Sequence, residues 1–116
     1  MSIQRIEAGP RMSKAVVHGD TVYLAGQVAD AAKGKSVGEQ TKEILSIIDG
    51  LLAKAGTDKT KLLSANIWLA DISTFAEMNA QWDAWIVAGE TPARATVEAK
   101  LAAPDYKVEI MVVAAK

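Results

Sequence analysis

Apolar and polar residues alternate along two stretches near the end of the chain, residues 94–101 and 107–114. Successive side chains of a strand point to opposite faces, so each stretch is expected to be a β-strand with one apolar face. We interpret the residues between them as a short loop and the two strands as a hairpin. If the apolar sets of both strands share one side of the sheet, Arg94 and Glu109 lie together on the other side. The apolar sets are Ala95, Val97, Ala99 and Leu101 in the first strand and Val108, Ile110, Val112 and Ala114 in the second.

The face that carries Arg94 and Glu109 also carries Met111 and Val113. A sheet face in contact with solvent is polar throughout, whereas this face mixes charge with apolar side chains. We therefore expect something to cover it, and another copy of the chain is the simplest cover.

Other parts of the chain also have the alternation or the composition of strands. Gly19 and Asp20 separate two of these runs and predict a two-residue hairpin turn. Gly26 follows one run, where a bare backbone lets a ligand or a neighbouring chain approach closely. The expected strands are residues 3–7, 14–18, 21–25 and 61–70.

Two segments have helical periodicity. The first is predicted to begin at a capping box made by Ser36 and Glu39 and to run to about Ala55, with Gly56 as its stop. Its apolar residues form a broad stripe that should be buried. The stripe contains Thr41, Ile44, Leu45, Ile48, Leu51, Leu52 and Ala55.

The second helix is predicted to be capped by Asp71 or Ser73 and to end near Gly89, before Pro92 opens the next strand. Its large apolar residues recur at helical spacing, and we interpret them as core rather than as a platform for stacking nucleotides. They are Phe75, Met78, Trp82 and Trp85.

This order of elements predicts an α+β fold in a single domain, residues 1–116. A strand–helix–strand sequence indicates a crossover, so the sheet should be mixed with at least one parallel pair. Two helices of similar length fit on one face of that sheet and leave the opposite face bare.

Composition excludes several classes of function. The chain has 13 Lys and Arg against 14 Asp and Glu, a net charge of −1, so nucleic acid is an unlikely partner. It has no cysteine, which excludes disulfides and thiolate nucleophiles, and its single histidine disfavours a histidine metal site. No apolar run reaches membrane-spanning length and no signal core is evident, so we expect a cytoplasmic protein without membrane contact.

Arg94 stands at the start of a strand, after Pro92 and Ala93. One interpretation is a structural ion pair with a carboxylate such as Glu98 or Glu109. The other is a fork that binds a substrate carboxylate through two hydrogen bonds.

Glu109 lies between Val108 and Ile110 in a strongly apolar strand. It is either a solvent-facing carboxylate or one that positions a water molecule or moves a proton. The expected hairpin would set Glu109 opposite Glu98, about 13 Å along the strand from Arg94. A shared site would then need the reach of arginine, a substrate between the two residues, or a second chain.

At these residues the sequence resembles the RidA/YjgF family of reactive intermediate deaminases, over nearly the whole chain. The resemblance implies a chorismate-mutase-like fold that forms homotrimers with a β-barrel-like core and ligand clefts between subunits. It rests on residues 23–27, 51–56, 69–75, 92–98 and 108–110, together with Gln40 and Asn79.

The resemblance also implies an activity, the hydrolysis of enamines and imines such as 2-aminoacrylate and 2-iminobutanoate to 2-keto acids and ammonia. Pyridoxal-phosphate enzymes release these intermediates. Arg94 would hold the substrate carboxylate and Glu109 would direct water to the imine carbon. Groups near Gly26 and Thr96 would complete the pocket, with Asn79 near its wall. No metal and no organic cofactor is implied.

Two residues depart from the family pattern. Its best-known members have a tyrosine aligned with Met12 and a serine aligned with Ala25, so both pocket hydroxyls are missing here. Besides deamination, two alternatives stay open. One is a trimer that binds a small carboxylate or a protein without turnover, and the other is a ribonuclease or translation-inhibiting activity.

Overall fold

The computed structural model describes all 116 residues, folded as six strands and two α-helices. Short 3₁₀ turns, Lys59–Lys61 and Ile72–Thr74, precede β4 and α2. The strands are β1 (Ile3–Ala8), β2 (Ser13–His18), β3 (Thr21–Leu24), β4 (Leu62–Leu69), β5 (Ala93–Glu98) and β6 (Val108–Ala115), and the helices are α1 (Val37–Lys54) and α2 (Phe75–Trp85).

The strands form one mixed sheet in the order β1-β2-β3-β6-β4-β5. β4 and β5 are parallel and are joined through α2, while all other neighbours are antiparallel. The predicted crossover and the predicted hairpin around Gly19 are therefore confirmed. Gly19 has a φ of +60°, a backbone conformation that glycine adopts at no steric cost.

The hairpin predicted from the last two strands is wrong, because β4 lies between β5 and β6. Residues 99–107 do not form a tight turn but pass across the end of β4. Trp68 of β4 is paired with both Val97 and Glu109, so these three share a face. Ala95 and Val97 thus lie on the face of Glu109, not with the core residues of β6, and Arg94 and Thr96 face the opposite way.

Helix α1 follows its prediction closely. The Ser36 hydroxyl accepts a hydrogen bond from the Glu39 amide at 3.1 Å, and Gly56 ends the helical path with a φ of +83°. Every residue of the predicted stripe is buried, from Thr41 to Ala55. Burial of this stripe against the sheet gives the helix its stability, since propensity alone is weak.

Helix α2 is shorter than predicted, because the chain becomes extended at Ile86 instead of continuing toward Gly89. The Asp71 carboxylate caps the 3₁₀ turn before the helix by accepting from the Ser73 amide at 2.9 Å. Hydrogen bonds from the Ser73 hydroxyl and amide hold the pKa of Asp71 below its usual value. Of the predicted stripe, Met78 and Trp82 are buried, whereas Phe75 is 40% exposed.

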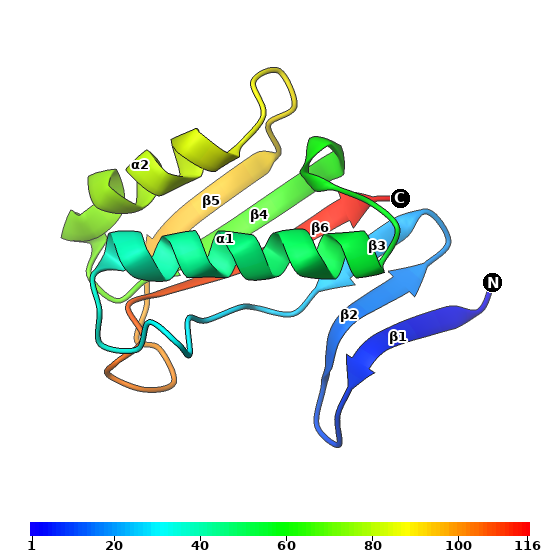
Figure 1. Cartoon of the computed structure of the whole chain (residues 1–116), viewed down its shortest axis with the longest axis horizontal. Helices are drawn as coiled ribbons and strands as arrows, with labels where there is room; N and C mark the ends of the chain where they lie inside the picture. Colours follow the sequence, from blue (N-terminus) through cyan, green and yellow to red (C-terminus); the bar gives the residue numbers. More distant parts are fainter.

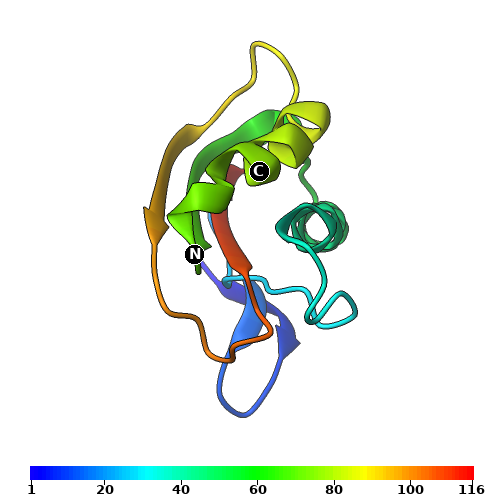
Figure 2. The same cartoon turned by 90° about the vertical axis from the view of Figure 1, so that its left-hand side faces the viewer.

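Both helices lie on one side of the sheet, as Figures 1 and 2 show. The core fills the space between the two layers. The other side of the sheet has no covering element, which confirms the predicted bare face. It carries Tyr23, Val97, Met111 and Val113, and Tyr23 and Val97 are 48% and 51% exposed.

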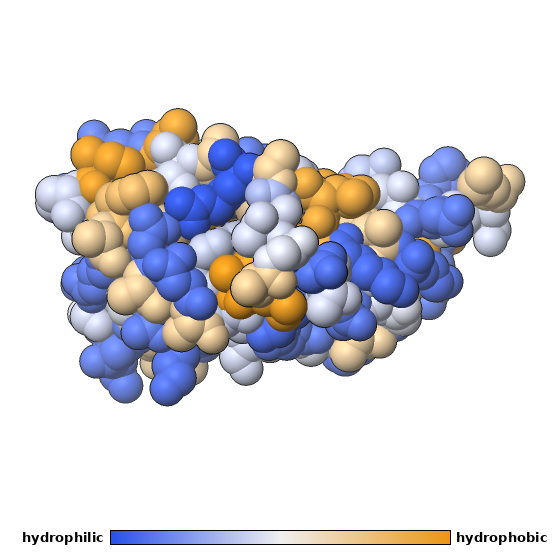
Figure 3. Space-filling view, turned by 90° about the horizontal axis from the view of Figure 1, so that it is seen from above, coloured by the Kyte–Doolittle hydropathy of each residue, from blue (hydrophilic) through white to orange (hydrophobic).

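Neither helix has the combination of length and apolar character needed to cross a membrane. Seen from above, over the loop that follows α2, the surface shows separate apolar patches divided by hydrophilic side chains (Figure 3). The surfaces left without a cover are the bare sheet face and the two free edges of the sheet, at β1 and β5.

Candidate functional site

Arg94 projects from β5 toward α2. Its Cζ atom lies 5.1 Å from the ring centroid of Trp82 and 5.8 Å from that of Phe75. The single salt bridge of the chain joins Lys54 to Glu7, and no hydrogen bond engages the guanidinium of Arg94. The ion pair with Glu98 or Glu109, one of the two interpretations of Arg94, is absent from the chain.

Two further polar atoms on the same face have no partner. Asn79 Oδ1 on α2 and Thr96 Oγ1 on β5 are both buried and make no hydrogen bond. Thr96 follows Arg94 by two residues and so shares its face of the strand. Asn79 lies between Phe75 and Trp82 on one stripe of α2. A buried polar atom without a partner is costly, so each of the two atoms lacks a hydrogen bond that the single chain does not supply.

Glu109 belongs to the other face of the sheet. A Cβ atom built on Gly26 would lie 2.1 Å from Glu109 Oε2, which shows how closely the carboxylate approaches this backbone. Gln27, next in the chain, is buried and pairs with Ile110 through the backbone. The group that approaches Gly26 is thus Glu109 of the same chain, whereas the sequence led us to expect a ligand or a neighbouring chain.

Ala25 directly precedes Gly26, whereas Met12 lies 14 residues before Gly26 in the chain. The Ala25 carbonyl accepts from Gln27 Nε2 at 2.8 Å, and its amide donates to the Lys14 carbonyl at 2.9 Å. Met12 lies in the connection between β1 and β2, with its side chain 50% exposed.

The candidate residues therefore form two groups on opposite faces of one sheet. The arginine group contains Asn79, Arg94 and Thr96, and the glutamate group contains Gly26 and Glu109. The prediction that Arg94 and Glu109 share a face is wrong. The reason is the insertion of β4, which changes the partner of β5 and with it the direction of every side chain of that strand.

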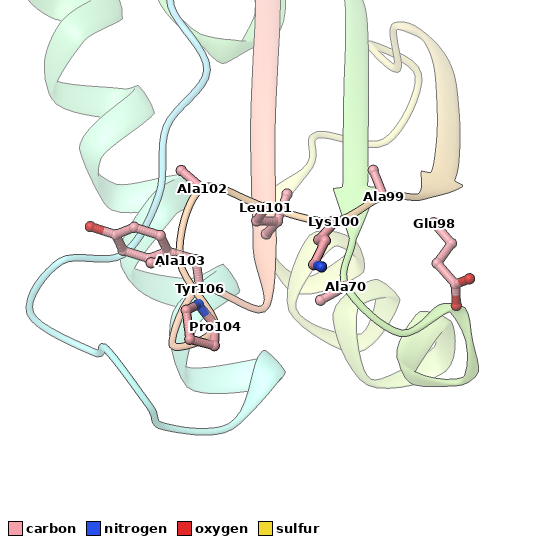
Figure 4. Close-up of a pocket in the computed structure, with 9 residues that line it drawn as sticks. All are labelled: Ala70, Glu98, Ala99, Lys100, Leu101, Ala102, Ala103, Pro104 and Tyr106. Carbon is pink, nitrogen blue, oxygen red and sulfur yellow. The ribbon is translucent and has the colours of Figure 1, made fainter.

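The largest cavity, about 620 Å³, lies elsewhere, under the loop between β5 and β6 (Figure 4). Its polar groups are largely engaged. Glu98 accepts from the Ile72 amide at 3.0 Å, and the Tyr106 hydroxyl donates to the Asp30 carboxylate, which raises the pKa of Tyr106. None of the predicted site residues lines this cavity. It is lined by Ala70, Glu98, Ala99, Lys100, Leu101, Ala102, Ala103, Pro104 and Tyr106.

Sequence reasoning missed the contact of Phe75 and Trp82 with Arg94, because their spacing was assigned to the core. The available signal was the order of the elements. The helix that carries this stripe leads directly into a strand whose second residue is Arg94. No group of three or more His, Asp or Glu side chains is arranged to hold a metal ion.

The fold and these two groups define an α+β domain of the chorismate-mutase-like class. A family model described as Endoribonuclease L-PSP matches residues 2–116. The chain is 47% identical over 114 residues to a RutC family protein of Haemophilus influenzae, covering 98% of both chains. It is 48% identical over 115 residues to the RutC family protein YoaB of Escherichia coli K12, covering 99% of both.

A solved structure is equally similar. A member of the YjgF protein family from Neisseria meningitidis has a TM-score of 0.96 and 46% identity, covering 100% of this chain and 96% of that one. The chain therefore belongs to the RidA/YjgF family.

Proposed function

We propose that the protein hydrolyses reactive enamines and imines of the 2-aminoacrylate and 2-iminobutanoate type to 2-keto acids and ammonia. The observation that supports this proposal most strongly is the set of contacts made by Arg94. Its guanidinium is half-buried, contacts two aromatic rings and has no anionic partner in the chain. A planar cation with free N–H groups binds a carboxylate in a bidentate manner.

In the proposed reaction, water attacks the carbon of the protonated imine while Glu109 takes a proton from the water, which gives a carbinolamine. Glu109 returns that proton to the nitrogen, the C–N bond breaks to release ammonia, and the hydroxyl loses its proton to solvent to leave the 2-keto acid. An enamine first takes a proton on carbon to become the imine. Because an imine is already electrophilic, positioning of the two reactants supplies much of the rate acceleration. This chemistry is expected in the cytoplasm.

The two groups of candidate residues lie on opposite faces of one chain, so the proposal requires a second copy. The arginine group lies beside the free edge of β5, and the glutamate group lies on the bare face. Packing of that bare face against β5 of a neighbour would bring the groups together. We propose a homotrimer closed in this way, with one site at each subunit contact.

Binding without turnover is the second candidate, and two departures from the family pattern favour it. Met12 and Ala25 supply no hydroxyl where the family's best-known members have a tyrosine and a serine. A coupled assay separates the two candidates: 2-aminoacrylate or 2-iminobutanoate is generated enzymatically and formation of the keto acid is followed. Binding of a keto acid without faster hydrolysis would favour the second candidate.

The description of the family model names an endoribonuclease, which makes RNA cleavage a third candidate. The net charge of −1 argues against it, because affinity for RNA depends on neutralising phosphates.

Arg94→Lys tests the proposal directly. Lysine keeps the charge but loses the planar fork, so kcat/KM should fall roughly 30- to 1000-fold, the size of a lost charge-assisted pair. The oligomeric state and Tm should stay near those of the wild type. Lys42→Arg is the control for a charge-conserving exchange, since Lys42 lies exposed on α1, on the helix side of the sheet. Full activity of Arg94→Lys would show that the site lies elsewhere.

A further inference from the structure

We infer that Phe75 and Trp82 are positioning residues that hold the guanidinium of Arg94 ready for a substrate carboxylate. We call this pair the aromatic clamp. The inference rests on the proposed function, because it assigns to α2 the task of setting the geometry of the same arginine.

The positions of the rings follow from the helix. Phe75 and Trp82 are seven residues apart, about two turns, so both side chains leave α2 on one stripe. That stripe faces β5, where the Arg94 Cζ atom lies 5.8 Å and 5.1 Å from the two ring centroids. Both distances fall within the range of about 6 Å in which a cation is attracted to an aromatic face.

Trp82 is itself fixed on its other side. Its ring centroid lies 5.4 Å from that of Trp85 at an interplanar angle of 57°. The Trp85 indole donates to Asp49 of α1 at 2.9 Å, and Lys59 Nζ donates to the Trp85 carbonyl at 2.6 Å. Trp82 is only 5% exposed. A continuous set of contacts thus connects α1 to the guanidinium.

This arrangement affects binding in two ways. A free arginine side chain loses rotamer freedom when it binds a ligand, whereas a clamped one has lost most of it already. The aromatic rings contact the guanidinium without using its N–H groups, so these remain available for hydrogen bonds.

The clamp is tested by titration calorimetry with 2-oxobutanoate, the stable product of 2-iminobutanoate hydrolysis. Trp82→Leu removes an aromatic face and should weaken binding roughly 3- to 30-fold. Trp82→Phe keeps a face and should restore binding to near the wild-type level. In turnover of 2-iminobutanoate, Trp82→Leu should raise KM by a larger factor than it lowers kcat, because Arg94 holds the substrate rather than reacting.

Trp85→Phe is the control for stability. It removes the hydrogen bond to Asp49 but keeps a ring against Trp82, so Tm should fall while affinity is retained. If Trp82→Leu does not fold, Phe75→Leu decides, because Phe75 is 40% exposed and its ring is not needed for the core. Its affinity should also fall, by about 3-fold.

The clamp also has a spectroscopic signature that needs no ligand. Ring currents should shift the Nε–H resonance of Arg94 in the wild type, and Trp82→Leu should move it toward the position of an exposed arginine. Clamp variants that fold, bind as tightly as the wild type and leave this resonance unchanged would overturn the inference but not the proposed function. Absence of 2-oxobutanoate binding in the wild type would overturn both.

Discussion

Gly26 determines where the carboxylate of Glu109 can stand. A Cβ atom at this position would lie 2.1 Å from Oε2 and 3.0 Å from Cδ of that glutamate. Such contacts do not occur, so a larger residue must displace the carboxylate. Because the carboxylate ends a flexible side chain, the backbone can accommodate the change. Gly26 is thus a residue whose replacement should affect chemistry more than folding.

Gly26→Ala is expected to fold normally and to lose activity. The displaced Glu109 can no longer direct water, so kcat should fall on the order of 100-fold, the lower range for a general base. The effect on stability should stay within about 0.5 kcal/mol. Steady-state kinetics and a thermal melt check both parts. Activity equal to that of the wild type would show that the present position of the carboxylate is irrelevant to the reaction.

Candidate site residues could be named from the sequence, but the sheet faces that their side chains occupy could not. Glu109 was singled out as a carboxylate in a strongly apolar strand, and Arg94 as an arginine at the start of a strand, after Pro92 and Ala93. Which face each one occupies depends on the partner of its strand, and alternation leaves that partner undetermined. The contact of Trp82 with Arg94 could not be predicted either. A stripe of large apolar residues on a helix has the same spacing whether it packs in the core or contacts a cation.

At the scale of elements, α1 shows what local sequence specifies well. Its cap, its stop and its buried stripe all depend on residues within the helix or next to it, and all were predicted. Gly50 is the exception to an otherwise favourable sequence. It lies exposed in the helix interior, and a Cβ atom there would meet nothing within 4 Å.

Gly50→Ala should therefore stabilise the protein. Alanine restricts the unfolded chain more than glycine does and favours the helix by roughly 0.5–1 kcal/mol. Tm measured at a fixed protein concentration should rise by a few degrees. Gly56→Ala is the comparison variant and should lower Tm, because Gly56 has a φ of +83° and alanine is strained there. A lower Tm for Gly50→Ala would mean that this surface of α1 is covered by something.

The sheet shows where prediction from local pattern ends. Each strand was found within a few residues, and the β2–β3 hairpin was correct because its two-residue turn fixes the pairing. The pairing of β5 and β6 was not, because the connection over residues 99–107 is long enough to cross the end of β4. When the connection between two strands is long, tertiary packing decides which strand lies next to which. The local sequence contains no signal for that choice.

At the scale of the whole molecule, two of the uncovered surfaces lie next to the candidate residues. β5 is an edge strand with a free row of backbone groups, and an exposed edge invites pairing or packing with another chain. The bare face beside it carries Tyr23, Val97 and Met111, which are apolar yet not buried within the chain. The two groups of candidate residues lie at these same surfaces, so assembly and activity should be lost together.

Val97→Lys tests that coupling. The wild type should scatter light as about three times the 12.3 kDa chain mass. A lysine on the bare face beside the edge of the sheet adds a charge that packing would have to desolvate. The variant should therefore dissociate and lose deaminase activity while each chain keeps its secondary structure. Leu63→Lys is the matched control, because Leu63 is also 51% exposed but lies at the irregular start of β4. It should leave a trimer with full activity. An active monomer, from either the wild type or Val97→Lys, would show that one chain contains a complete site and that the two groups of residues need no second copy.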